Sequence, residues 1–226
     1  AYEILTCDWS SDVCSSDLGT LNVVQAAREL GVAKVVHTST SEVYGTARFV
    51  PITEEHPLRG HPAAHNVQNR VEAEVLVEEW RQRHPDTEVT VLRPCWIVGP
   101  SIWDAVTRYL ARPVVPTLLG YDPLFQFVHE EDVLHAFLQA ALEGRPGIYN
   151  VVGQGVLPLS TLLRSAGKTV LPIPSPLLYR LRYYPSRSQT GDPPEGFYDY
   201  LRYLWVADGQ RGFEAFGEPV YSSQEA

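Results

Sequence analysis

Two short apolar runs, each preceded by a segment of helical periodicity, most constrain the fold of this chain. Residues 20–30 carry apolar side chains at helical spacing and stop at a glycine, and the apolar run around residues 35–36 follows. Residues 65–84 form a second amphipathic segment, which ends at a proline before the apolar run 89–92. Helix then strand, repeated, is the order of a parallel sheet. We therefore expect an α/β protein.

A run of hydroxyl side chains follows the first apolar run. Residues 39–45 read Ser-Thr-Ser-Glu-Val-Tyr-Gly. In open α/β sheets, ligands bind at the carboxyl ends of the strands. The predicted position of this stretch therefore makes it the first candidate for a binding site.

Three further landmarks follow along the chain. They are Leu-Arg-Pro with Val-Gly-Pro at 92–100, Phe-Val-His-Glu-Glu-Asp-Val at 127–133, and Tyr-Asn-Val-Val-Gly at 149–153. In this order and spacing, from Gly19 to the C-terminus, the chain resembles the extended short-chain dehydrogenase/reductase family, also called the NAD-dependent epimerase/dehydratase family. The resemblance implies a partial Rossmann-type doubly wound parallel sheet, with its first strands missing, and a small C-terminal α+β substrate lobe.

The segment before Gly19 looks foreign to the rest of the chain. Residues 9–18, Trp-Ser-Ser-Asp-Val-Cys-Ser-Ser-Asp-Leu, can be encoded by a common sequencing-library adapter read in frame, although a natural Ser/Asp-rich loop is the alternative. We therefore expect residues 1–18 to be non-native and adapter-derived. Residues 19–100 are then the C-terminal part of the NAD(P)-binding core, and residues 101–226 are mainly the substrate-binding lobe with interleaved core elements.

Charge and cysteine content narrow the function classes. The net charge of -9 becomes -5 without the four acidic residues of the foreign segment. Basic residues are scattered among carboxylates, so we expect no nucleic-acid binding, which needs a basic stripe. No apolar run approaches the length that spans a bilayer, so we expect no membrane partner. Cys95 is the one cysteine outside that segment, which fits a reducing cytosol; we expect a cytoplasmic protein without a metal site.

The cofactor site is represented only by its nicotinamide end. Family members hold NAD(P) on a glycine-rich turn after the first strand, and residues 1–226 contain no such turn. The nearest glycine pair, Gly153-Gln154-Gly155, follows a late strand and lacks the third glycine, so we interpret it as a turn. The resemblance therefore implies NAD or NADP in a full-length parent and none on this fragment. It also implies that the nicotinamide end is lined by Thr38, Ser39, Pro94, Cys95, Trp96 and Ile97.

Thr40 is the first candidate catalytic residue. Aligned on Val43-Tyr44-Gly45, it takes the position of the family's Ser/Thr that hydrogen-bonds the reacting oxygen. The alternative is a strand-end threonine that bonds to its own turn.

The family's Tyr-x-x-x-Lys pair is replaced in this chain. Aligned on Glu72-Ala73-Glu74, Asn66 takes the tyrosine position and Arg70 the lysine position. Asparagine cannot exchange a proton near neutral pH, and arginine lacks the compact ammonium group of lysine. A shift of one residue would instead place His65, a potential base, at the tyrosine position.

Candidate substrate contacts in the lobe are Tyr121, Phe127 and His129. His129 would face the substrate lobe, and Asp132 would cap or brace the following helix. The alternative is that the aromatic residues belong to the core and that His129 and Asp132 simply fix the lobe.

Two hypotheses about function follow. In the first, the parent is an NAD(P)-dependent oxidoreductase, epimerase or dehydratase that acts on a nucleotide sugar or a related small molecule, and Thr40 or His65 compensates for the replaced pair. In the second, it binds a dinucleotide as a catalytically inactive sensor or scaffold. The sequence leaves the activity of the parent open, and the fragment itself is predicted to be inactive. The resemblance also implies a homodimer through the two long helices, residues 19–30 and 65–84.

Because the phosphate-binding turn is absent from its sequence, the 226-residue chain is expected not to bind NAD(P) measurably. Isothermal titration calorimetry of the chain with NAD and with NADP checks this expectation. A micromolar dissociation constant for either would contradict it.

Overall fold

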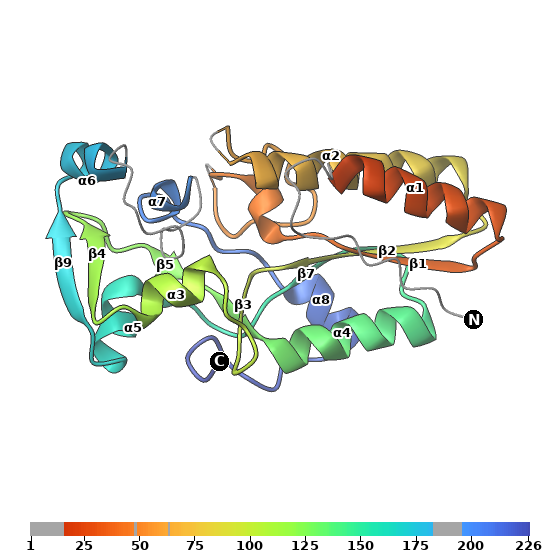
Figure 1. The fold of residues 1–226 in the computed structure, drawn as a ribbon. Coiled ribbons are helices and arrows are strands. Elements are labelled where there is room, and N and C mark those ends of the chain that lie inside the picture. Colours follow the sequence, from red (N-terminus) through yellow and green to blue (C-terminus); the bar gives the residue numbers. More distant parts are fainter. Residues whose placement is uncertain (1–15, 48, 63, 183–195) are drawn as a thin grey trace.

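The chain is described by a computed structural model over residues 16–47, 49–62, 64–182 and 196–226. It has two parts (Figure 1): a three-stranded sheet between two helical layers, and a smaller lobe of short strands and helices at one end of the sheet. Residues 1–15, which carry most of the adapter-like segment, lie outside the described residues.

The central sheet is parallel, as its sequence predicts. Thr38 lies opposite Leu92, and Leu92 lies opposite Tyr149, so the carboxyl ends of the three strands lie at one edge. Its strands, in spatial order, are β1 Lys34–Thr38, β2 Glu88–Pro94 and β7 Gly147–Val151. Every residue of β2 after Glu88 is buried, because helices cover both faces of the sheet.

Two helices lie on each face of the sheet (Figure 1). On one face, Val24, Val77 and Trp80 pack against the valines of β2. On the other face, the small side chains of Ala136 and Ala140 belong to a helix that packs on β1 and β2, and Phe216 of a second helix packs on Tyr149 of β7. The four helices are α1 Ser16–Glu29, α2 His65–Arg83, α4 Glu130–Glu143 and α8 Gln210–Phe216.

The ends of the long helices follow mostly from sequence. Gly31 has a φ of +61°, which a glycine adopts without strain, and α1 ends just before it. The α2 helix begins at His65 and ends before Pro85, as predicted. The start of α1 differs from expectation, because the helix begins at Ser16 and thus includes the last residues of the segment assigned as foreign.

The lobe is built from pairs of short strands and from short helices. Two pairs are parallel, β3 Trp96–Val98 with β6 Phe127–His129 and β4 Val114–Leu118 with β9 Thr169–Ile173. The third pair, β5 Leu124–Phe125 with β8 Leu157–Pro158, is antiparallel. The helices are α3 Ala105–Ala111, α5 Leu159–Ser165, α6 Ser175–Arg182 and α7 Phe197–Tyr200.

The segment around Pro172 forms a strand despite its prolines. Its prolines indicate irregular structure, yet residues 169–173 form β9 and pair with β4, which itself contains Pro116. Proline is tolerated at the edge of a sheet, where its missing N–H faces solvent. In this two-stranded sheet both strands are edges, and β9 is exposed over most of its length.

A close approach of two loops fixes the turn after β1. This turn is the 3₁₀ helix η1 Ser41–Tyr44, and Gly45 follows it with a φ of +66°. A side chain at Gly45 would collide with the carbonyl of Gly60, whose own N–H donates to Val43 O at 2.8 Å. The glycine therefore holds η1 against the loop that leads into α2.

Candidate functional site

The residues after β1 and the end of β2 lie side by side. Ser39 N donates to Leu92 O at 2.8 Å, and Ser41 Oγ donates to Pro94 O at 3.0 Å. The stretch that contains Thr40 therefore meets the segment around Pro94 at the carboxyl edge of the sheet. The predicted proximity of these two segments is confirmed.

Thr40 caps η1. Its Oγ1 accepts a hydrogen bond from Glu42 N at 3.3 Å, which is the bond to its own turn that the sequence allows. The hydroxyl hydrogen can still be donated, because that bond uses only a lone pair of the oxygen. Thr40 is buried, so a ligand that accepts this hydrogen would have to enter the junction between sheet and lobe.

Glu42 is a further candidate site residue, which motif matching missed. Its carboxylate Oε1 accepts from Trp96 Nε1 at 3.4 Å. Burial raises the pKa of Glu42; the charge of Asp104 raises it further, and those of Arg70 and His61 lower it. A carboxyl group with a raised pKa keeps its proton to a higher pH than an exposed one, which suits it to proton transfer. The available sequence signal was an acidic residue within the hydroxyl-rich stretch.

The residues predicted to replace the Tyr-x-x-x-Lys pair lie on α2 and differ in their exposure to solvent. His65 and Asn66 lie in its first turn and are exposed. Arg70 is half-buried, and its charge acts on Glu42 and on His37, whose pKa is lowered chiefly by burial. Of the three candidates, Arg70 is the one whose charge reaches the carboxyl group of Glu42.

The residues predicted to line the nicotinamide end differ in their surroundings. Thr38 is exposed, whereas Ser39 Oγ is directed to α2 and donates to Glu74 at 2.6 Å. Pro94 accepts from Ser41, and Trp96 donates to Glu42. Burial raises the pKa of Cys95 to about 12, so this thiol is not a nucleophile at neutral pH. Ile97 packs on the Cys95 side of β3.

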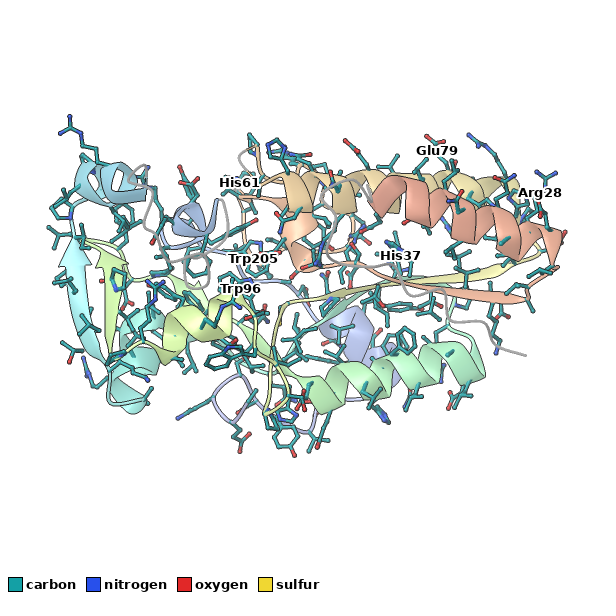
Figure 2. All side chains as sticks on the ribbon, viewed as in Figure 1. Arg28, His37, His61, Glu79, Trp96 and Trp205 are labelled. Atoms are coloured by element: carbon teal, nitrogen blue, oxygen red, sulfur yellow. The ribbon has the colours of Figure 1, made fainter. Side chains whose placement is uncertain are left out.

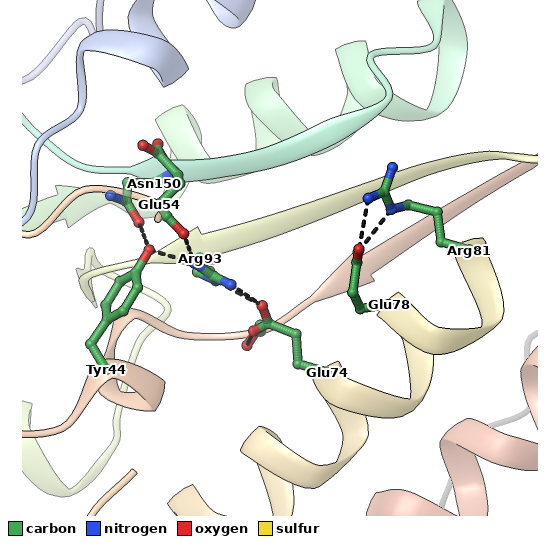
Figure 3. Close-up of polar contacts among 8 residues, drawn as sticks. Tyr44, Glu54, Glu74, Glu78, Arg81, Arg93 and Asn150 are labelled. Carbon is green, nitrogen blue, oxygen red and sulfur yellow. Dashed lines mark hydrogen bonds and ion pairs between the residues drawn. The ribbon is translucent and has the colours of Figure 1, made fainter. Parts of the chain in front are cut away.

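A buried ion pair connects α2 to β2 (Figure 3). Arg93 Nε donates to Glu74 Oε1 at 2.8 Å, and a second guanidinium nitrogen donates to the same oxygen. Both residues are 2% exposed. Burial lowers the pKa of Arg93, but the hydrogen bonds and charge of Glu74 outweigh that effect, and the pKa is raised.

The same arginine extends the network to the turn after β1. Arg93 Nη1 donates to Tyr44 Oη at 2.6 Å, and Tyr44 Oη donates to Asn150 Oδ1 on β7 at 2.7 Å. Burial raises the pKa of Tyr44 to about 12. Glu54 completes the set, since its carbonyl accepts from Arg93 and its carboxylate accepts from Asn150 N at 2.8 Å. The network thus ties η1 to all three strand ends and α2.

The three predicted substrate contacts lie in different surroundings. Phe127 is buried, and its ring centroid lies 6.3 Å from that of Trp96. Both rings belong to an aromatic cluster that also contains Tyr109, Phe125, Phe197, Tyr200 and Trp205. Tyr121 is 44% exposed, and the guanidinium of Arg202 lies over its ring. The ring of His129 lies 4.1 Å from that of Tyr221. Phe127 is therefore the one of the three that packs on Trp96.

The hydrogen bonds of His129 and Asp132 define the structural role of each. His129 is the N-cap of α4, because its Nδ1 accepts from Glu131 N at 3.3 Å. Asp132 does not cap the helix; it accepts from Val220 N at 2.8 Å and from Tyr221 N at 3.3 Å. The cap falls on His129 because it immediately precedes the first turn, in which Asp132 lies. Asp132 instead fixes the C-terminal segment.

The core and the lobe also meet through a hydrogen bond between side chains. His61 Nε2 lies 3.0 Å from Asp199 Oδ2, and the ring of His61 is 5.9 Å from that of Tyr200. Figure 2 shows His61 above Trp96 and Trp205, between the sheet and the lobe. Together with Glu42, these residues form the junction of the two parts.

A cavity of about 270 Å³ lies elsewhere, between α4, the end of β7 and α8. None of the predicted site residues lines it. Its floor includes Phe213 and Phe216, and its polar lining includes His135 and Glu218. The chemistry-bearing junction and this cavity are therefore separate places. Within the described ranges there is no group of residues that could hold a metal ion, and no helix is long and apolar enough to cross a membrane.

A model of the NAD dependent epimerase/dehydratase family matches residues 15–152. The chain belongs to this family. An uncharacterised protein of Mycobacterium tuberculosis strain H37Rv is 32% identical over 213 residues, which cover 92% of this chain and 57% of that protein. The UDP-glucose 4-epimerase of Mycolicibacterium smegmatis is 34% identical over 90 residues, covering 39% of this chain and 28% of the epimerase.

Solved structures of family enzymes share the fold. DesIV, a dTDP-glucose 4,6-dehydratase of Streptomyces venezuelae with NAD and TYD bound, superimposes with a TM-score of 0.69 at 20% identity, covering 94% of this chain and 64% of DesIV. The UDP-glucuronic acid 4-epimerase of Bacillus cereus in complex with NAD has a TM-score of 0.67 at 17% identity, covering 97% and 68%. The chain thus spans about two thirds of each of these two solved enzymes and just over half of its M. tuberculosis relative.

Replacing Glu74 with glutamine is expected to destabilise the fold by about 3–5 kcal/mol, because it leaves the charge of Arg93 buried without its partner. The matched control is Glu78→Gln, which breaks the exposed pair with Arg81 on the same helix and should cost less than about 1 kcal/mol. Urea denaturation measures both free energies of unfolding. Equal costs would show that the buried pair contributes no more than a surface pair.

Glu42→Gln is expected to become more stable relative to the natural chain as the pH rises from about 4 to about 8. Because burial raises the pKa of Glu42, the folded state keeps a proton that the unfolded chain releases, and the stability from that proton is lost as the pH rises through the folded-state pKa. Glutamine stays neutral throughout. Thermal unfolding across this pH range checks the sign.

Glu78→Gln is the control for this pH series. A hydrogen bond from Arg81 lowers the pKa of Glu78, so its relative stability should fall over the same range. A Glu42→Gln difference that is constant with pH, or that falls with it, would contradict a raised pKa.

Proposed function

We propose that a full-length protein containing this chain acts on a nucleotide sugar or a related small molecule, with NAD or NADP as cofactor. Thr40 and Glu42 would contact the reacting group at the carboxyl edge of the sheet. Support comes from family membership and from enzymes of this fold, named for dTDP-glucose and UDP-glucuronic acid. The observation that carries the proposal is the position of Glu42 beside the strand tips. Its carboxyl group accepts a hydrogen bond from Trp96, and the charge of Arg70 acts on it.

The residues present fit only one end of the cofactor. Thr38 to Thr40 and Pro94 to Ile97 meet at the strand tips, which suits a nicotinamide ring, while a glycine-rich phosphate turn is not part of residues 1–226. When bound, the nicotinamide group would accept or return a hydride. Protein groups would then orient the substrate and move protons. His65 and Asn66 are exposed in the first turn of α2, and Arg70 keeps its proton at neutral pH, so we assign that task to Glu42.

The proton-transfer role of Glu42 follows from its surroundings. In its neutral form the carboxyl group can donate to a leaving or reacting oxygen, and as a carboxylate it can accept a proton from carbon or hydroxyl. The raised pKa brings the two forms closer in free energy at neutral pH. Thr40 would donate its hydroxyl hydrogen to the same substrate, and Arg70 would stabilise the carboxylate when it forms.

The second candidate function is a catalytically inactive dinucleotide-binding sensor or scaffold. The observation in its favour is the loss of the Tyr-x-x-x-Lys pair: Asn66 takes the tyrosine position and is exposed, and Arg70 takes the lysine position. On this alternative Glu42 would bind a ligand hydroxyl without turnover.

We also propose that the protein is cytoplasmic and that it forms a homodimer through α1 and α2. Leu21 and Val23 on α1 and Val75 on α2 are each more than 40% exposed, and they give the paired helices an apolar outer surface. Two such helix pairs can pack as a four-helix contact.

The proposed substrate class is tested by calorimetry of the 226-residue chain with UDP-glucose and with UDP. Binding is the readout because turnover by this chain is not expected. UDP-glucose should bind more tightly than UDP, and Glu42→Gln should weaken UDP-glucose about three- to tenfold by replacing a proton donor and acceptor with an amide. Glu78→Gln is the matched control. Absence of UDP-glucose binding, or equal binding of UDP-glucose and UDP, would contradict the proposal.

A further inference from the structure

Among the described aromatic residues of the lobe, two buried polar groups have no hydrogen-bond partner. Tyr200 is 3% exposed and Trp205 is 4% exposed, yet no group of the described residues hydrogen-bonds the hydroxyl of Tyr200 or the indole N–H of Trp205. Their ring centroids are 5.4 Å apart. A buried donor without an acceptor loses its hydrogen bonds to water, and native proteins leave few such groups unpaired.

Neighbouring donors in the same aromatic cluster do have acceptors. Trp96 Nε1 donates to Glu42, and Tyr109 Oη donates to Pro116 O at 2.6 Å. The cluster thus has acceptors for some of its buried donors and leaves two without. Both unpaired donors belong to the short segment from α7 to Trp205. Their proximity indicates that they serve one binding site and are not unrelated packing defects.

The two donors lie next to the proposed reacting carboxyl group. The ring of Trp96, whose indole nitrogen contacts Glu42, lies 5.0 Å from that of Trp205 and 6.1 Å from that of Tyr200. The charges of Glu42 and Asp199 both act on the phenol of Tyr200. Burial is the main cause that raises the pKa of Tyr200, and these two charges raise the pKa further. The hydroxyl therefore keeps its hydrogen and can only be a donor or a neutral acceptor.

We propose that Tyr200 Oη and Trp205 Nε1 are binding-site donors that hydrogen-bond uncharged oxygen atoms of a ligand beside Glu42, with water in their place in the free protein. Two donors need acceptors, which selects oxygen atoms of hydroxyl or carbonyl groups. The carboxylates of Glu42 and Asp199 disfavour an anionic group. The surrounding rings favour a ligand with an apolar face. The identity of that ligand as the sugar of a nucleotide sugar rests on the proposed function.

Nuclear magnetic resonance of the ¹⁵N-labelled chain tests the ligand part. The chain has five tryptophans, and Trp205→Phe identifies the indole N–H signal of Trp205. UDP-glucose should shift this signal, and UDP should leave it in place. Tyr200→Phe should weaken UDP-glucose binding about three- to tenfold and leave UDP binding unchanged.

Two variants are matched controls. Trp80 carries another buried indole N–H without a partner, on α2 and outside the aromatic cluster, so Trp80→Phe should not alter the ratio of UDP-glucose to UDP affinity. Tyr109→Phe removes a buried hydroxyl whose partner is known, and it should also leave this ratio unchanged. Either variant weakening UDP-glucose as much as Tyr200→Phe would overturn the inference, because the effect would then be a general loss of packing.

Failure of the inference differs from failure of the proposed function. If UDP-glucose binds while the Trp205 signal stays in place or Tyr200→Phe binds normally, the inference is overturned and the substrate class stands. If UDP-glucose does not bind, the substrate class fails, and a high-resolution crystal structure of the free chain decides the inference. Ordered water within hydrogen-bonding distance of both donors supports it. A protein oxygen at either donor, or a donor with no acceptor, overturns it.

Discussion

The buried ion pair between Glu74 and Arg93 is the interaction on which the rest of the site depends. Buried charges are stable only when their hydrogen-bonding capacity is satisfied. The polar atoms of Glu74 and Arg93 therefore need hydrogen-bond partners at defined positions around them. Glu74 holds the hydroxyl of Ser39, and Arg93 holds the phenol of Tyr44. Ser39 and Tyr44 flank Thr40 and Glu42 in the sequence. A turn that would otherwise be free to move is thereby fixed to the carboxyl end of the sheet.

This arrangement separates two kinds of polar chemistry within one short stretch. The side chains of Ser39 and Tyr44 are directed to the interior and are used to hold the structure together, whereas Thr40 and Glu42 lie at the junction with the lobe. The immediate neighbours of Glu42 come from separate parts of the chain, including Trp96 on β3 and Arg70 on α2. A site assembled this way requires a supported turn, because the proposed reactive group, Glu42, is carried by the turn and not by a strand or a long helix.

Much of the fold could be predicted from the sequence, because apolar periodicity and helix-ending residues act locally. The three strands of the central sheet and the bounds of α2 are examples. The role of Glu42 could not be found in this way, since its pKa depends on burial by residues far apart in the chain. Tyr200 and Trp205 were missed for the same reason. The contacts of Asp132 could not be predicted for another reason: the C-terminal segment supplies backbone N–H groups that the sequence does not place near α4.

The junction is built so that a carboxyl group of the core is enclosed in part by the lobe, which meets the core through His61 and Asp199. Enclosure by the lobe is one source of the low polarity around Glu42. Any separation of the two parts would hydrate this group and turn it into a stronger acid. By thermodynamic linkage, protonation of Glu42 favours the arrangement in which the lobe encloses it. The acidity of this side chain and the spacing of the two parts are therefore coupled.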